Sequence, residues 1–99
     1  MVVPADGFEV TDATGASRFE LMRDGELVGI ADYRSRGAAV VVPHVETLVR
    51  YRGQGYGGRL MAGIVDILRR EGRTIVPQCP FAAAYLRDHP DDADVVDPA

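Results

Sequence analysis

Residues 50–59 read RYRGQGYGGR, a run in which four of the ten residues are glycine and three are arginine. This composition predicts a loop. After it, apolar residues recur at the spacing of one helix face: Leu60, Met61, Ile64, Val65 and Leu68. Before it, the pattern is that of a strand. A loop between a strand end and a helix start exposes free backbone N–H groups at the positive end of the helix dipole, so it predicts an anion site that glycines allow a phosphate to approach.

Two common phosphate-binding motifs match this loop only in part. Gly53 and Gly58 have the outer spacing of a nucleotide-binding P-loop, but Arg59 and Leu60 stand where that motif requires lysine and a hydroxyl residue. Gly53, Gly55 and Gly58 also fit the dinucleotide pattern G-x-G-x-x-G, but no carboxylate follows at a strand end about 20 residues later. A chain of 99 residues is, in addition, too short for a dinucleotide-binding fold.

A third match, Arg52-x-x-Gly55-x-Gly57, resembles the pyrophosphate loop of the GNAT superfamily of acyltransferases, R/Q-x-x-G-x-G/A. The resemblance implies an α/β (α+β) fold with a central mixed, mostly antiparallel sheet, one long helix after the pyrophosphate loop and a short C-terminal helix. It also implies acetyl-coenzyme A as the cofactor, with the pyrophosphate on backbone amides and the pantetheine arm along the preceding strand end. The cofactor-binding residues implied in this way are Leu48, Val49, Arg52, Gly53, Gln54, Gly55, Tyr56, Gly57, Gly58 and Arg59. Arg50 is a further candidate for a charge-assisted phosphate contact.

Two more segments are similar to those of a subgroup of very short GNAT proteins. They are His44-x-Glu46 before the loop, and Pro77-x-Cys79-Pro80-Phe81 after the long helix, followed by Tyr85 and His89-Pro90. With them the resemblance covers residues 19–90. The chain departs from the subgroup at Val45, where threonine is common, and at Asp91-Asp92, which replace an aromatic residue. Both departures lie outside the pyrophosphate loop, and they leave the acceptor pocket undefined.

Four residues are candidates for the chemistry of acetyl transfer, which needs a neutral amine, a polarised carbonyl and a stabilised thiolate. Glu46 is the first candidate for the general base, and His44, on the same strand face, is the second. By resemblance, Cys79 lies near the thioester as a proton donor or transient acetyl acceptor, and Tyr85 resembles the tyrosine that protonates the departing sulfur. Each also has a structural alternative, Glu46 as a solvated carboxylate and the other three as packed or hydrogen-bonded residues.

The rest of the chain predicts short strands and one further helix. Residues 18–34 read as a β-hairpin with Asp24-Gly25 as its turn, and the apolar run 38–42 as a strand covered on both faces. Pro43 interrupts that run. Gly72 ends the long helix, residues 73–76 form a short buried strand, and Pro80 opens a helix over residues 81–88.

The composition predicts one domain, residues 1–99, with a core over about residues 17–90. The acidic tail 91–99 is expected to be poorly ordered, although Val95 and Val96 can dock as an edge. A net charge of −4 gives no overall attraction to nucleic acid or an anionic membrane, and no apolar run approaches the roughly 18 residues of a membrane span. Residues 1–7 have no secretory pattern, which favours the cytoplasm. The single cysteine excludes an internal disulfide and a cysteine metal cluster, and we expect no metal.

The resemblance implies an N-acetyltransferase that moves the acetyl group of acetyl-coenzyme A to an amine, and we expect direct transfer in a ternary complex. The acceptor is a small-molecule or protein amine, and a monomer or weak homodimer is expected, with no nucleic acid or membrane partner. The alternative is a non-catalytic sensor or interaction module that binds coenzyme A or acetyl-coenzyme A. That alternative arises because the chain lacks much of the N-terminal region that larger relatives use to bind an acceptor.

Overall fold

A computed structural model of the protein describes residues 7–98. Within them lie five strands and two α-helices: β1 (Phe8–Ala13), β2 (Arg18–Arg23), β3 (Glu26–Arg36), β4 (Ala39–Thr47), α1 (Tyr56–Glu71), β5 (Thr74–Pro77) and α2 (Pro80–Asp88). The strands form one sheet in the order β1-β2-β3-β4-β5, antiparallel except that β5 runs parallel to β4. The predicted fold class, a mixed and mostly antiparallel sheet with one long and one short helix, is confirmed.

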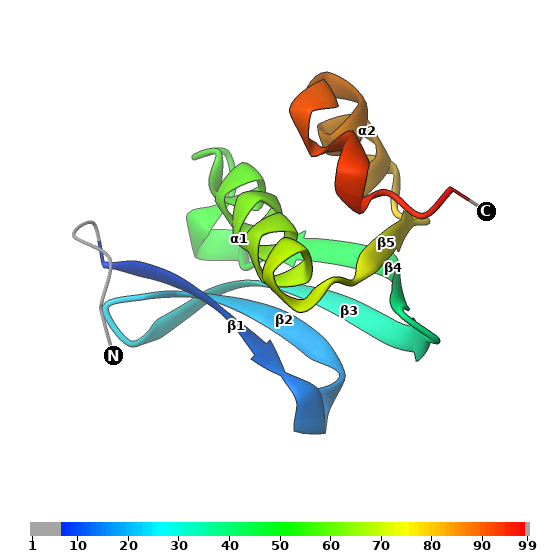
Figure 1. Ribbon diagram of the computed structural model, residues 1–99. Coiled ribbons are helices and arrows are strands. Elements are labelled where there is room, and N and C mark those ends of the chain that lie inside the picture. The colour runs from blue at the N-terminus through cyan, green and yellow to red at the C-terminus, as the bar shows by residue number, and fades with distance from the viewer. Residues whose placement is uncertain (1–6, 99) are drawn as a thin grey trace.

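The helices cover only one face of the sheet (Figure 1). The covered face contributes Phe19, Leu21 and Val40 to the core, and α1 adds its buried stripe of Leu60, Met61, Ile64, Val65, Ile67 and Leu68. No helix of residues 7–98 lies on the opposite face (Figure 1). None of the helices in residues 7–98 is long and apolar enough to span a bilayer.

The hairpin predicted over residues 18–34 is present as β2 and β3. Its turn places Asp24 at φ 50° and Gly25 at φ 85°. Two successive residues with positive φ match the right-handed twist of the flanking strands, which is why an Asp-Gly pair favours a tight hairpin.

Strand β1 lies N-terminal to the first strand that the sequence predicts. It pairs with β2 over its whole length, from Phe8 opposite Arg23 to Ala13 opposite Arg18. It also contacts the helix layer, because Val10 packs directly against Gly63 of α1. The core therefore begins before residue 17, since a short strand with partly buried residues is stabilised here by its neighbours rather than by its own pattern.

We expect Gly63→Ala to destabilise the protein, because a Cβ at this position would overlap the side chain of Val10. The overpacking should exceed the gain in helix propensity and leave a net loss of about 1–2 kcal/mol. Urea unfolding measures the change. Gly58→Ala is the matched control, since its Cβ meets open space and the same helix propensity should make the protein slightly more stable. Equal stability of the two variants would contradict the close approach of α1 to β1.

The C-terminal segment corrects the expectation of a poorly ordered tail. Residues Pro90–Val95 form a 3₁₀ helix, and Arg69 of α1 bonds with Asp92 at 3.2 Å and Asp94 at 2.7 Å. The bond from Arg69 lowers the pKa of Asp94. Val95 is buried and Val96 bridges to Ile75, which confirms the predicted docking of these two residues as an edge. The acidic composition suggested disorder, but an arginine on a distant helix compensates for it; Ala99 lies outside the described residues.

A cluster of polar side chains connects β1, β3 and the residue before β5. The Tyr33 hydroxyl donates to Asp12 at 2.6 Å, and Arg73, just before β5, pairs with Asp12 at 3.5 Å. Burial, followed by the hydrogen bond and charge of Asp12, raises the pKa of Tyr33 to about 12.

We expect the stability of the protein to fall as the pH rises from the ordinary tyrosine pKa of about 10 towards 12. A phenol with a raised pKa in the folded state favours folding while it stays protonated, and this contribution is lost as the pH passes through the folded-state pKa. Tyrosinate absorbance and urea unfolding at several alkaline pH values check this. The loss should be smaller in Tyr33→Phe, and an equal loss in both proteins would contradict the assignment.

Candidate functional site

The loop before α1 leaves the helix start open. Gly53 and Gly55 both have φ of 79°, a left-handed conformation that favours glycine, and Gly55 is the N-cap of α1. No side chain caps this helix, and its first turn has no acidic residue. The first N–H groups of an α-helix have no partner within the helix, so those of Tyr56, Gly57 and Gly58 face outward at the positive end of the dipole.

Beside this loop, β4 loses its neighbour. Of β4, only Ala39–Val42 pairs with β5, and the pairing ends where the Cys79 N–H donates to the Val42 carbonyl at 3.0 Å. A β-bulge opposite Tyr33 contributes to this separation, since two residues of β4, Val42 and Pro43, lie between partners that one residue separates on β3. The second half of β4 therefore has a free edge on the side of α2.

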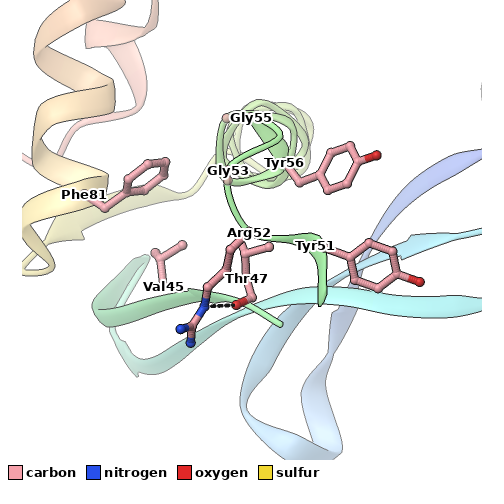
Figure 2. A pocket seen from close by; sticks show the side chains of 10 residues that line it. Val45, Thr47, Tyr51, Arg52, Gly53, Gly55, Tyr56 and Phe81 are labelled. Atoms are coloured by element: carbon pink, nitrogen blue, oxygen red, sulfur yellow. Dashed lines mark hydrogen bonds between the residues drawn. The ribbon is translucent and has the colours of Figure 1, made fainter. Parts of the chain in front are cut away.

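Val45 and Thr47 direct their backbone groups towards that free edge. The Leu48 N–H donates to Val28 of β3 at 2.9 Å, and alternate residues of an antiparallel strand bond to opposite sides. The side chains of Val45 and Thr47 point towards the loop (Figure 2).

Loop, free edge and α2 enclose a pocket of ≈ 330 Å³. Figure 2 shows Phe81 of α2 on one side and Tyr51 and Tyr56 on the other. The lining residues are Val45, Thr47, Tyr51, Arg52, Gly53, Gly55, Tyr56, Gly57, Gly58 and Phe81. Six of the ten cofactor-binding candidates from the sequence are among them: Arg52, Gly53, Gly55, Tyr56, Gly57 and Gly58.

The other four candidates lie outside the lining. Gln54 is exposed, and the Arg59 guanidinium lies 4.2 Å from the centre of the Phe8 ring. Leu48 and Val49 lie beyond the end of β4, which corrects the predicted strand end. Both residues belong to a 3₁₀ turn, in which the Leu48 carbonyl accepts from Tyr51 and the Val49 carbonyl accepts from Arg52. The free edge therefore ends two residues before Val49, at Thr47.

Two arginines anchor the loop. The Arg52 side chain donates to the Thr47 carbonyl at 3.1 Å, which joins the strand end to the pocket wall. Arg50 instead pairs with Glu26 at 2.8 Å, outside the lining.

His44 and Glu46 share a sheet face, as predicted, and His44 Nε2 lies 3.0 Å from Glu46 Oε1. That face is the one opposite the pocket, because side chains alternate along β4 and the intervening Val45 lines the pocket. Both side chains are exposed, 51% for His44 and 40% for Glu46. They stand on the part of β4 that does not pair with β5.

Cys79 and Tyr85 occupy different surroundings. Cys79 is 7% exposed, belongs to the core and sits at the N-cap of α2, where the pairing of β4 and β5 ends. Tyr85 stacks on His89 with ring centres 3.8 Å apart. Neither Cys79 nor Tyr85 lines the pocket. Burial raises the pKa of Tyr85, and the nearby carboxylates Asp92 and Asp66 add to the effect. Those neighbours place the ring beside the middle of α1 and the C-terminal segment.

Four residues of the pocket wall were not predicted from the sequence to belong to the site: Val45, Thr47, Tyr51 and Phe81. A signal existed for the first two, because residues that alternate with His44 and Glu46 must project from the opposite face. Phe81 is 45% exposed, and its ring packs over the α carbon of Gly57, where a Cβ would come within 2.6 Å of the ring. No sequence pattern predicts that contact between two helices.

The model of the GCN5-related N-acetyl-transferase family matches residues 18–95. Among solved structures, a GCN5-like protein of Staphylococcus aureus superposes with a TM-score of 0.69 at 20% identity, over 97% of this chain and 93% of that one. The ribosomal-protein-S18-alanine N-acetyltransferase of Escherichia coli superposes with a TM-score of 0.56 at 18% identity, over 87% of this chain and 53% of its own length. No curated protein sequence matches significantly. At these identities the two structures establish a shared fold.

Proposed function

Because the chain belongs to the GCN5-related N-acetyl-transferase family, we propose that it binds acetyl-coenzyme A in the pocket at the start of α1 and transfers the acetyl group to an amine. The observation that carries this proposal is an uncapped helix start that opens into a pocket beside a free strand edge. The uncapped helix start suits a diphosphate, because its N–H groups can donate to phosphate oxygens. The free strand edge suits an arm that carries amides, because amides can pair with a strand.

The residues of the pocket fit the three parts of such a molecule. The outward N–H groups of Tyr56, Gly57 and Gly58 can hold a pyrophosphate, and Arg52 adds a positive charge at the same wall. The backbone N–H and carbonyl of Val45 and the N–H of Thr47 can pair with the amides of a pantetheine arm as an added strand would. The Thr47 carbonyl already accepts from Arg52. An arm on this edge leads towards Cys79, where the gap closes.

Acetyl-coenzyme A supplies a thioester, whose acyl carbon accepts the amine while the carbon–sulfur bond breaks and the second proton of the nitrogen passes to the departing sulfur. The amine approaches from the open face of the sheet, where Glu46 and His44 stand beside the gap. Glu46, hydrogen-bonded to His44, takes the proton of the ammonium and releases a neutral nucleophile. The carboxylate of Asp32 lies on the same face and favours a cationic acceptor. Glu20, also on this face, is already paired with Arg18 at 2.7 Å. The acceptor is a small-molecule or protein amine.

Direct transfer is the proposed route, because the alternative nucleophile is enclosed. The Cys79 side chain is 7% exposed and belongs to the core, which hinders attack on the thioester by its sulfur. Tyr85 has its ring stacked on His89 beside the middle of α1, so we assign it a packing role. The departing thiolate is then stabilised by backbone dipoles beside the separation of β4 and β5.

Calorimetric titration with acetyl-coenzyme A, ATP and NAD tests the proposed ligand. We expect micromolar binding of acetyl-coenzyme A alone. Arg52→Ala should weaken it by about fivefold, the value of one charge-assisted contact, whereas Arg34→Ala, at the far end of β3, should not. Binding without release of thiol in the presence of a broad amine panel would favour the non-catalytic sensor, and absence of binding would overturn the proposal.

A further inference from the structure

We propose that the acceptor is an amine with an apolar substituent, which lies on an apolar patch of the open sheet face beside Glu46. The patch consists of Met22, Leu27, Ile30 and Leu48. This inference rests on the proposed function and deepens it, because it assigns the chemical class of the acceptor. A molecule with a charged amine head and an apolar tail, such as an alkylamine, belongs to that class.

The patch lies on the open face because side chains alternate along a strand. Met22 follows the core residue Leu21 and pairs with Leu27 across β2 and β3, and Glu9 of β1 forms the rim beside Met22. All four patch residues are partly buried, yet none belongs to the core of residues 7–98 or packs against it. The helices α1 and α2 lie on the other side of the sheet (Figure 1). An apolar patch outside the core marks a surface that a ligand can cover.

Two residues of the patch flank the proposed base. Ile30 is the cross-strand partner of Glu46, and such partners have Cβ atoms about 4.5–5.5 Å apart. Leu48 lies two residues after Glu46, and its N–H donates to Val28 of β3, so its side chain shares the face of Glu46. The substituent of an amine held at Glu46 is therefore within reach of both Ile30 and Leu48.

The charged groups lie on the other side of Glu46. Asp32 and His44 are cross-strand partners one step further along the sheet, in the direction away from Leu48. The Asp32 carboxylate has no ion pair with another residue of 7–98. An ammonium head therefore fits between Glu46 and Asp32 by charge, and its substituent extends over Ile30 towards Leu48.

The patch favours an apolar tail over a charged one. Full burial of a methylene strengthens binding by about fourfold. The open face covers only one side of the tail, so half of this free energy, or about twofold for each methylene, is expected. A second ammonium at the end of the tail would lose hydration over Leu27, Ile30 and Leu48, which offer it no carboxylate.

Release of free thiol from acetyl-coenzyme A with methylamine, propylamine, pentylamine and cadaverine tests the inference. The three monoamines have nearly equal basicity, so their kcat/KM values compare the substituents. We expect kcat/KM to rise from methylamine to pentylamine by about tenfold to twentyfold. Cadaverine has the carbon chain of pentylamine and a second ammonium, and its kcat/KM should be about tenfold lower than that of pentylamine.

Substitutions in the patch should remove the rise in kcat/KM along the monoamine series. Ile30→Thr should abolish most of it, and Leu48→Thr, which changes a residue outside the strands, should reduce it in part. Val76→Thr is the matched control: Val76 follows the core residue Ile75, so it lies on the open face, but it pairs with Val41 in the other half of β4. The rise should be unchanged in Val76→Thr. Circular dichroism shows whether each variant is folded.

The outcomes separate this inference from the proposed function. Equal kcat/KM values for the three monoamines would overturn the apolar subsite and leave the acetyltransferase proposal intact. If sedimentation also revealed a dimer that Ile30→Thr dissociates, a second copy of the chain would be the occupant of the patch. A rise that survives both Ile30→Thr and Leu48→Thr would overturn the assignment to these residues. Release of thiol with none of the amines would overturn both proposals.

Discussion

Glu46→Gln is expected to lower kcat by about 10²- to 10³-fold, the usual contribution of a general base. The amide is nearly the same size as the carboxylate and can still accept a hydrogen bond from His44, but it cannot take a proton from the ammonium of the acceptor. Since Glu46 projects from the face opposite the pocket, the affinity for acetyl-coenzyme A should not change. Release of free thiol from acetyl-coenzyme A with a panel of amines measures kcat, and calorimetry measures the affinity.

His44 permits a sharper test of the same pair. If the two side chains act as one unit, His44→Asn should also lower kcat, and the double variant should lose little more than the worse single variant. Additive losses would mean that the two residues act separately. This comparison also distinguishes a base that His44 merely positions from a base that is His44 itself, because the larger single effect identifies the group that takes the proton.

Glu20→Gln is the matched control, since Glu20 and Glu46 lie on the same open face with Ile30 between them. It removes a carboxylate of the same size two strands away from the gap. We expect it to leave kcat nearly unchanged, because Glu20 is already paired with Arg18. An equal loss of kcat in Glu20→Gln and Glu46→Gln would show that the charge of the face matters and that no individual base does.

The features that could be predicted from the sequence are those that depend on residues close together in the chain. The glycine loop, the amphipathic α1 and the Asp24-Gly25 turn are each specified within a few residues, because dihedral preference and side-chain period act locally. The alternation that puts His44 and Glu46 on one face is equally local. These features also fix the loop at the start of α1, which is why six of the residues that line the pocket could be named in advance.

The features that the sequence did not predict depend on contacts between distant segments. Strand β1 exists because β2 pairs with it and Gly63 leaves room for Val10. The ordered C-terminal segment depends on Arg69, more than 20 residues before the carboxylates that it binds. The free edge of β4 results from the departure of β5, which has no signal in residues 43–47. The bulge beside it has one local signal, Pro43, which interrupts the apolar run.

Contacts between distant segments also determine the surroundings of two candidates for the chemistry, Cys79 and Tyr85. Cys79 and Tyr85 were assigned by resemblance, and one can know their exposure only once α2 is placed against the core. The structure gives Cys79 a structural position at the N-cap of α2 and stacks Tyr85 on His89. The roles of Glu46 and His44 remain predictions that the variants above test.

Gly57→Ala is expected to weaken binding of acetyl-coenzyme A by about 10- to 100-fold, although the protein should stay folded. A Cβ here would lie 2.6 Å from the Phe81 ring, so the ring must move, and the open space beside it is the pocket lined by Val45 and Thr47. Displacements of this kind cost about 1–3 kcal/mol in a packed site. The fold should survive because Phe81 is 45% exposed and alanine favours the helix. Calorimetry measures the affinity.

The double variant Gly57→Ala, Phe81→Ala decides why the affinity falls. The new methyl group takes only space that the ring holds in the natural sequence, so removing the ring should restore most of the affinity and bring the double variant close to Phe81→Ala alone. Such a recovery is the coupling that a shared volume produces. If the double variant stays as weak as Gly57→Ala, the methyl group itself meets the ligand, and the pyrophosphate must approach the helix start more closely than the position of Phe81 implies.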